Sequence, residues 1–351
     1  MAIRDIYGVG RIALAAALLG LSAPALAHAE VAARAAAKAE GTLAEFENVD
    51  RDAKDPAAVL KILQQDLYET EAYAIENQFL LQYGDRISMR TIRYASGHDL
   101  IPGHIFTPKH LAAGKKYPAI VVVHGGFHGS FDRTWYQIVD TLVEQGYVLF
   151  FPEYRSSRGY GPDTYKNDYG VTDVADVFAG ADYFETLPYV DKARLGILGE
   201  SRGGMITVSA IEQKPQRFKV AVDVVGLMDF VAYMAYKPNY RRDEVARESP
   251  SFEGKLPDRN LQQYINVSPI NFVEKIQTPV LVIGTKGDES VPVSYNAERL
   301  VSLLKLNNKA FDAKIYDNAP GGHEMMSAQT PERYDATDRI VRWLGRYLKS
   351  E

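Results

Sequence analysis

The sequence predicts an α/β protein built on a mostly parallel central sheet with helices on both faces. Several short, almost continuous runs of β-branched and other apolar residues are typical of strands that are buried on both faces of a parallel sheet. Amphipathic helical patterns lie between these runs, and this alternation favours an open α/β architecture. The chain has 351 residues, enough for one large domain or two smaller ones.

The predicted strands and helices follow one another from about residue 86 onward. Two alternating segments, 87–94 and 100–107, flank a Ser96-Gly97 turn and predict a β-hairpin. Further strands are predicted over residues 118–124, 147–151, 195–198, 220–225, 279–283 and 311–316. Helices are predicted over residues 136–145, 171–186, 204–213, 294–304 and 337–348.

The N-terminal region predicts export. Arg4 and Arg11 precede an apolar run over residues 12–21, and small residues follow it, so we expect residues 1–29 to be a cleaved signal peptide. The run is shorter than the roughly 20 residues of a membrane span, although an uncleaved anchor helix is an alternative. We therefore expect a periplasmic or secreted protein without stable membrane insertion after cleavage. Residues 30–85 predict a helical segment that includes a helix over 55–83. Residues 86–351 predict the α/β domain.

Composition excludes several classes of chemistry. The chain has no cysteine, which removes disulfides, thiolate metal sites and cysteine nucleophiles. Its formal net charge is −5 and it has no dense basic run, so we expect no nucleic-acid partner. The sequence does not indicate an oligomeric state.

The central functional motif is Gly199-Glu200-Ser201-Arg202-Gly203. It follows a predicted buried strand and precedes a predicted helix, the context of the nucleophile elbow. The glycines allow the chain to reverse sharply, and the turn exposes the Ser201 hydroxyl. This motif predicts the α/β-hydrolase fold with Ser201 as the nucleophile; a serine in an ordinary glycine-rich turn is the alternative.

A serine nucleophile needs a base and an acid, and this fold supplies them in the chain order Ser, acid, His. Asp288 follows the predicted strand over 279–283, and His323 follows the last predicted strand. We therefore predict a catalytic triad of Ser201, Asp288 and His323. Glu289 is an alternative acid, and Asp288 could instead cap the helix that follows.

An oxyanion needs backbone donors near the nucleophile. His124-Gly125-Gly126 ends a predicted buried strand, and we expect one donor to be the amide of Gly125 or Gly126 and the other that of Arg202. His124 and His128 could be metal ligands, but the glycines explain the loop and no carboxylate cluster joins it. We expect no metal and no organic cofactor.

A long segment over residues 228–271 interrupts the strand–helix alternation. Long inserts in compact domains are commonly lids or binding loops, although this one could be a surface excursion. Its aromatic and basic residues, together with a tyrosine that follows an earlier strand, are candidate contacts for a small molecule or short peptide: Tyr154, Tyr233, Tyr236, Tyr240, Arg241 and Arg242.

Taken together, these motifs resemble the catalytic domain of the prolyl oligopeptidase family of serine peptidases, over about residues 86–349. The resemblance rests on His124-Gly125-Gly126, the segment from Tyr154 to Gly161, Gly199–Gly204, Gly287-Asp288 and Gly322-His323. It implies cleavage of peptides or acylated peptides through an acyl-enzyme. It also implies that the segment from Tyr154 to Gly161 braces the site.

Two departures from the family pattern keep the substrate open. Many members carry a β-propeller before the catalytic domain, whereas the stretch between the predicted signal and sheet is too short for several four-stranded blades. Some members place a tyrosine hydroxyl in the oxyanion hole where this chain has His124-Gly125-Gly126. A carboxylesterase acting on small or aromatic esters is therefore an alternative to a peptidase, and a non-catalytic binding protein on the same fold is a remote one.

Overall fold

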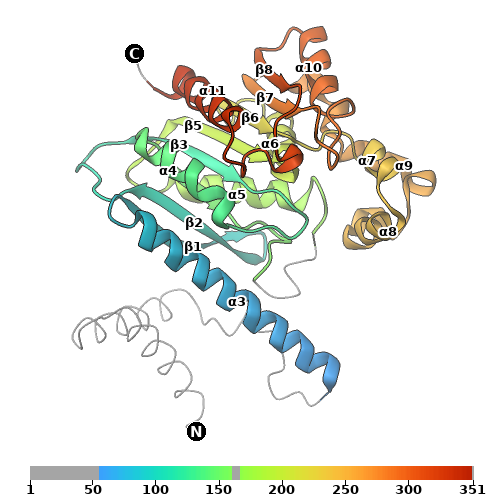
Figure 1. Ribbon diagram of the computed structural model, residues 1–351, viewed down its shortest axis with the longest axis horizontal. Helices are drawn as coiled ribbons and strands as arrows, with labels where there is room; N and C mark the ends of the chain where they lie inside the picture. Colours follow the sequence, from blue (N-terminus) through green and yellow to red (C-terminus); the bar gives the residue numbers. More distant parts are fainter. Residues whose placement is uncertain (1–54, 160–166, 350–351) are drawn as a thin grey trace. The chain divides into compact units, whose positions relative to one another are not determined.

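The structure is a computed structural model that describes residues 55–159 and 167–349 (Figure 1). Its strands form one eight-stranded sheet in the order β1-β2-β4-β3-β5-β6-β7-β8. The pairs β1–β2 and β2–β4 are antiparallel, and every other neighbouring pair is parallel. The predicted α/β-hydrolase fold is confirmed. The predicted signal peptide at 1–29 lies outside the described residues.

The strands lie close to their predicted positions, with the largest difference at β5. Its predicted core, 195–198, is extended in both directions: Val190 pairs with Tyr117 of β3 across a register shift, and Gly199 pairs with Val123. The eight strands are β1 (Ile87–Ser96), β2 (Asp99–Pro108), β3 (Tyr117–Val123), β4 (Val148–Pro152), β5 (Val190–Glu200), β6 (Val220–Val224), β7 (Val280–Thr285) and β8 (Phe311–Tyr316).

Two hydrophobic cores lie against the two faces of the sheet. Alternate residues of a strand point to opposite faces, so Val121 joins one core and Ile120 and Val122 join the other. The first core packs against α5 (Thr172–Glu185), α6 (Arg202–Gln213) and α10 (Ala297–Leu306). The second packs against α3 (Pro56–Tyr83), α4 (Tyr136–Glu144) and α11 (Pro331–Leu348).

Helix α3 anchors its C-terminal end through aromatic packing. Phe79 is fully buried and its ring packs edge-on against the rings of Phe106 and Tyr136 at 5.2 and 5.1 Å. The Tyr136 hydroxyl donates a hydrogen bond to the backbone oxygen of Ile75. Among the helices that the structure describes, none has the length and apolarity needed to cross a bilayer.

The predicted insert between β6 and β7 is helical and packed. It contains α7 (Phe230–Tyr236), α8 (Asn239–Glu248) and α9 (Pro257–Asn266), which lie together in gold in Figure 1. Phe230, Phe252 and Tyr264 are fully buried in the first core. The Phe252 and Tyr264 rings stack with centroids 4.0 Å apart. The insert is therefore held by its own aromatic side chains.

The sharp turn between β5 and α6 contains Ser201. Its backbone has φ 58° and ψ −118°, a conformation that residues other than glycine adopt rarely. The turn is tight because α6 packs directly against the end of β3: a Cβ atom on Gly203 would lie 2.1 Å from the Val123 oxygen and 2.6 Å from the His124 oxygen.

This packing predicts opposite effects for two glycine substitutions. Gly203→Ala should lower the free energy of unfolding by at least about 2 kcal/mol, because neither backbone oxygen can move without disturbing β3. Gly345→Ala, in α11, should raise it by up to about 1 kcal/mol, because the nearest atoms to a Cβ there are 4.0 Å away. Urea denaturation of both variants tests the pair; equal stability would contradict the close approach at Gly203.

Candidate active site

Three loops at the carboxyl edge of the sheet bring Ser201, His323 and Asp288 together. The Ser201 Oγ lies 2.8 Å from His323 Nε2, and His323 Nδ1 lies 2.7 Å from Asp288 Oδ2. Because the ionised carboxylate can only accept, His323 donates from Nδ1, which leaves Nε2 to accept the Ser201 proton. The structure thus joins the three predicted catalytic residues in one hydrogen-bonded chain.

Asp288, and not Glu289, is the partner of His323. Its second oxygen, Oδ1, accepts the amides of Ser290 and Val291 at 2.9 and 2.7 Å. Both oxygens of the buried carboxylate are therefore satisfied, and its orientation is fixed. Glu289 is exposed.

Two glycines directly before His323 allow the backbone to place its side chain at this position. Gly321 and Gly322 have φ values of 93° and 54°, in the region that favours glycine. A Cβ on Gly322 would lie 2.7 Å from the Gly287 oxygen, so the two loops approach each other closely only because this side chain is absent.

The electrostatics of the site favour a basic imidazole. Burial of the His323 ring opposes its charged form, but the hydrogen bond that the ring donates to Asp288 and the charges of Asp288, Glu200 and Glu324 outweigh burial and raise the pKa of His323 above 6.5. Burial also raises the pKa of Glu200 to about 7. We did not predict a role for Glu200, although its place directly before the nucleophile indicated that it would lie near the base.

The predicted oxyanion donors lie beside the nucleophile. A Cβ on Gly125 would be 2.9 Å from Ser201 Cβ, and Gly126 has a φ of 76°. Arg202 is the first residue of α6, so its N–H has no acceptor within the helix. Gly125 therefore lies against Ser201, and the Arg202 amide is at the N-terminus of the helix that follows Ser201.

His124 and His128 have separate partners. The buried His124 ring donates from Nδ1 to the Gly125 oxygen at 2.8 Å and contacts Ser157 Oγ at 2.8 Å. His128 bonds the Ser156 oxygen and Glu248 instead. Within the part of the chain that the structure describes, no group of three His, Asp or Glu residues is placed to hold a metal ion.

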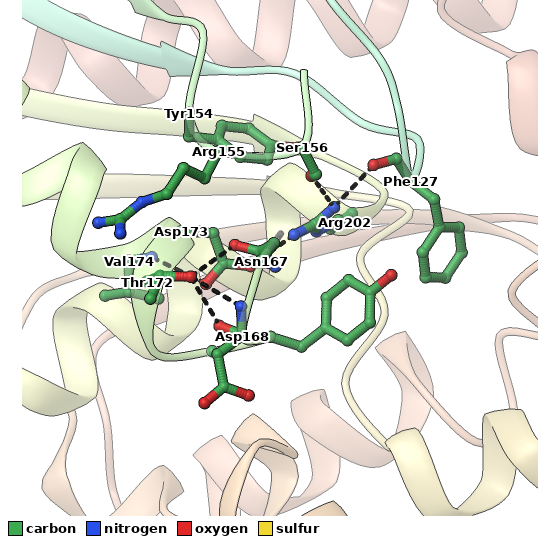
Figure 2. A network of polar contacts seen from close by, with 12 residues as sticks. Phe127, Tyr154, Arg155, Ser156, Asn167, Asp168, Thr172, Asp173, Val174 and Arg202 are labelled. Carbon is green, nitrogen blue, oxygen red and sulfur yellow. Dashed lines mark hydrogen bonds and ion pairs between the residues drawn. The ribbon is translucent and has the colours of Figure 1, made fainter. Parts of the chain in front are cut away.

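The Arg202 side chain forms a buried network that the sequence did not predict (Figure 2). Nη2 pairs with Asp173 Oδ2 at 2.9 Å, and Nη1 donates to the Phe127 oxygen and to Ser156 Oγ at 3.0 and 2.6 Å. The guanidinium also lies over the Tyr169 ring, 4.5 Å from its centroid. The network links α6, α5 and the loop that contains Gly125 and Gly126.

A cavity of about 420 Å³ opens at Ser201 and His323. The insert contributes to its lining three of the residues predicted as substrate contacts, Tyr233, Tyr240 and Arg241, and also Lys237, which was not among them. Other charged residues of the lining are Asp132, Glu200, Arg202 and Glu324. Residues of the insert and two residues of the triad, Ser201 and His323, therefore line the same cavity.

Three predicted substrate contacts do not line this cavity. Tyr154 is fully buried, and its hydroxyl donates to the His124 oxygen at 2.9 Å, so it braces the loop. The Tyr236 hydroxyl donates to the Ser290 oxygen at 3.3 Å, and its ring stacks on Tyr295. Arg242 donates to Asn239 on its own helix. Internal partners engage these three side chains, and the structure does not place them in the cavity lining.

The fold and the site define a serine hydrolase of the α/β-hydrolase class. The profile of the prolyl oligopeptidase family matches residues 133–351, more than half of the chain, and the chain belongs to that family. The resemblance found in the sequence is therefore confirmed.

Known relatives agree with this assignment. The chain is 27% identical over 73% of its length to an uncharacterized peptidase, YuxL, of Bacillus subtilis, and 29% identical over 70% to an acylamino-acid-releasing enzyme of Arabidopsis thaliana. It covers 39% and 32% of these two proteins, less than half of either. A solved acylaminoacyl peptidase of Pyrococcus horikoshii shares the fold, with a TM-score of 0.67 and 24% identity over 77% of this chain and 44% of that one.

The buried Arg202–Asp173 pair predicts a large loss of stability when one partner is removed. Arg202→Met should lower the free energy of unfolding by about 3–5 kcal/mol, because it leaves Asp173 buried and unpaired. Arg202→Met combined with Asp173→Asn should cost less than Arg202→Met alone.

Arg339→Met is the matched control, since the Arg339–Asp335 pair is partly exposed and should contribute less than about 1 kcal/mol. Urea denaturation measures all three variants. Similar losses for Arg202→Met and Arg339→Met would contradict the assigned importance of the buried pair.

Proposed function

We propose that this chain is a serine peptidase that cleaves short or N-acylated peptides through an acyl-enzyme on Ser201. The observation that carries the proposal is the hydrogen-bonded chain from Ser201 through His323 to Asp288 at the base of an open cavity. Similarity to acylamino-acid-releasing enzymes supports the peptide substrate.

In the proposed reaction, Ser201 Oγ attacks the carbonyl carbon of the scissile bond while His323 Nε2 takes its proton. Asp288 stabilises the imidazolium that forms, and the amides of Arg202 and of Gly125 or Gly126 stabilise the oxyanion. His323 then protonates the leaving amine, which departs and leaves the acyl group on Ser201. Water repeats the cycle, with His323 again as the base, and releases the acid product.

The polarity of the cavity favours peptides over apolar esters. Charged side chains of both signs line it, among them Asp132, Lys237 and Glu324. An aliphatic ester would desolvate these groups without compensating hydrogen bonds, whereas a peptide offers amide donors and acceptors. Carboxylesterase activity uses the same machinery and remains the alternative outcome of the substrate assay.

Replacement of the nucleophile should abolish turnover. Ser201→Ala should lower kcat on aminoacyl p-nitroanilides by on the order of 10⁵–10⁶-fold, because no other group can form the acyl-enzyme. The wild type should cleave these anilides and not only p-nitrophenyl esters of the same acyl groups. If the wild type cleaved only the esters, the proposed peptidase activity would be wrong and the protein would be an esterase. An unchanged rate in Ser201→Ala would refute the mechanism.

The pH dependence should report His323. Only neutral His323 can accept the Ser201 proton, so kcat/KM should fall as the pH drops through the raised pKa of His323, with a midpoint above 6.5. Glu200, with a pKa of about 7, is partly ionised in this range and raises the pKa of His323, so in Glu200→Gln the acid limb should move to lower pH, by less than the loss of a fully ionised neighbour would cause. A profile that Glu200→Gln leaves unmoved would contradict the electrostatic coupling between Glu200 and His323.

Export stays a prediction that rests on the sequence of residues 1–29. N-terminal sequencing of the mature protein from the producing cell distinguishes a cleaved signal peptide from an intact start at Met1.

A further inference from the structure

Apart from Arg202, whose charge is paired with Asp173, the charges around the catalytic cavity come from different elements according to their sign. The acids flank the catalytic residues or precede α4: Asp132, Glu200 and Glu324. The insert contributes two cations, Lys237 at the end of α7 and Arg241 on α8. The insert side of the cavity is therefore positively charged.

Lys237 is a cation without a carboxylate partner in the described parts of the chain. Its ammonium lies over the rings of Tyr233 and Tyr236, 5.0 and 5.4 Å from their centroids. Burial, followed by repulsion from Arg241, lowers the pKa of Lys237. Asp288 is the acid that acts on it most, but both oxygens of Asp288 are already engaged by His323 and two amides.

Arg241 is only partly compensated. Its Nη1 pairs with Glu244 Oε2 at 2.7 Å, and its guanidinium lies 5.0 Å from the centroid of the Phe127 ring. Phe127 directly follows the glycines proposed for the oxyanion hole, and Arg241 lines the same cavity as Ser201 and His323. Two positive groups and one carboxylate, Glu244, thus leave an uncompensated positive charge on this wall.

We propose that Lys237 and Arg241 form a subsite for a carboxylate of the substrate. A carboxylate between the two cations would offset their mutual repulsion and accept charge-assisted hydrogen bonds. It could belong to an acidic side chain of the acylating residue or to the free C-terminus of the leaving peptide. This inference rests on the proposed function, because it assigns the cavity to substrate.

Matched substrate pairs test the subsite and separate the two sources of the carboxylate. One pair is N-acetyl-Ala-Glu-p-nitroanilide and its Gln counterpart; the other is N-acetyl-Ala-Phe-Ala and its C-terminal amide. In at least one pair, the wild type should favour the carboxylate in kcat/KM by about tenfold. Lys237→Met and Arg241→Gln should each reduce that ratio toward one, and Lys237→Arg should retain it.

Arg247→Gln is the control variant. Arg247 lies on α8 but is exposed and outside the cavity lining, so its removal should leave the ratio unchanged. Equal rates within both pairs in the wild type would overturn the inference. The inference would also be overturned if Lys237→Met left the carboxylate preference in kcat/KM intact. It would be overturned too if Arg247→Gln reduced that preference as strongly as Lys237→Met does.

A binding measurement separates this inference from the proposed function. Calorimetry with the Ser201→Ala variant compares N-acetyl-Ala-Phe-Ala with its amide, and N-acetyl-Ala-Glu-amide with N-acetyl-Ala-Gln-amide. The subsite is supported if Ser201→Ala binds a carboxylate ligand more tightly than its amide and if adding Lys237→Met abolishes this preference. This holds even if the wild type cleaves none of the substrates, a result that would refute the proposed function alone. Turnover with no carboxylate preference in rate or binding overturns the subsite and leaves the peptidase proposal intact.

Discussion

The conformation of Ser201 is the constraint on which the rest of the site depends. Its left-handed backbone costs on the order of 1–3 kcal/mol, and several contacts hold it in place. The Ser201 amide donates to the Val224 oxygen at 2.8 Å, and its oxygen accepts the amides of Met205 and Leu227 at 3.1 and 3.2 Å. Strand β6 and the first turn of α6 therefore fix the turn, and the hydroxyl projects toward His323.

The side chain of the neighbouring Arg202 connects the Ser201 turn to the loop that contains Phe127 and to Asp173 on α5. Burying a guanidinium is costly unless it is paired, and the two terminal nitrogens of Arg202 are engaged by the Phe127 oxygen, Ser156 and Asp173. The position of the oxyanion loop thereby becomes coupled to that of the nucleophile. His128 adds a link from this loop to the insert, because its ring lies 2.7 Å from Glu248 on α8. Nucleophile, oxyanion loop and insert are thus joined by buried or half-buried polar contacts.

The sequence predicted the parts of the site that depend on strand order. Ser201 and Asp288 each follow a buried strand and His323 follows the edge strand β8, and the carboxyl ends of parallel strands meet at one edge of a sheet, so local patterns were enough to place them together. The Arg202 network could not be predicted in this way, because Asp173 and Phe127 are distant in the sequence and nothing local indicates that they meet. The insert shows the same limit: Arg241 and Arg242 are adjacent, but consecutive residues point in different directions from a helix, and only Arg241 lines the cavity. Tyr154 was predicted as a substrate contact from its position after a strand. Sequence position does not show whether a tyrosine hydroxyl meets a ligand or, as here, a backbone oxygen.

The central claim is that His323 activates Ser201 as the nucleophile, and covalent labelling tests it most directly. The protein would be treated with a fluorophosphonate and digested, and the modified residue identified by mass spectrometry. The account predicts one modified residue, Ser201, with no label on Ser201→Ala and much slower labelling of His323→Ala. Labelling of a different residue, or equal labelling rates for the wild type and His323→Ala, would contradict it.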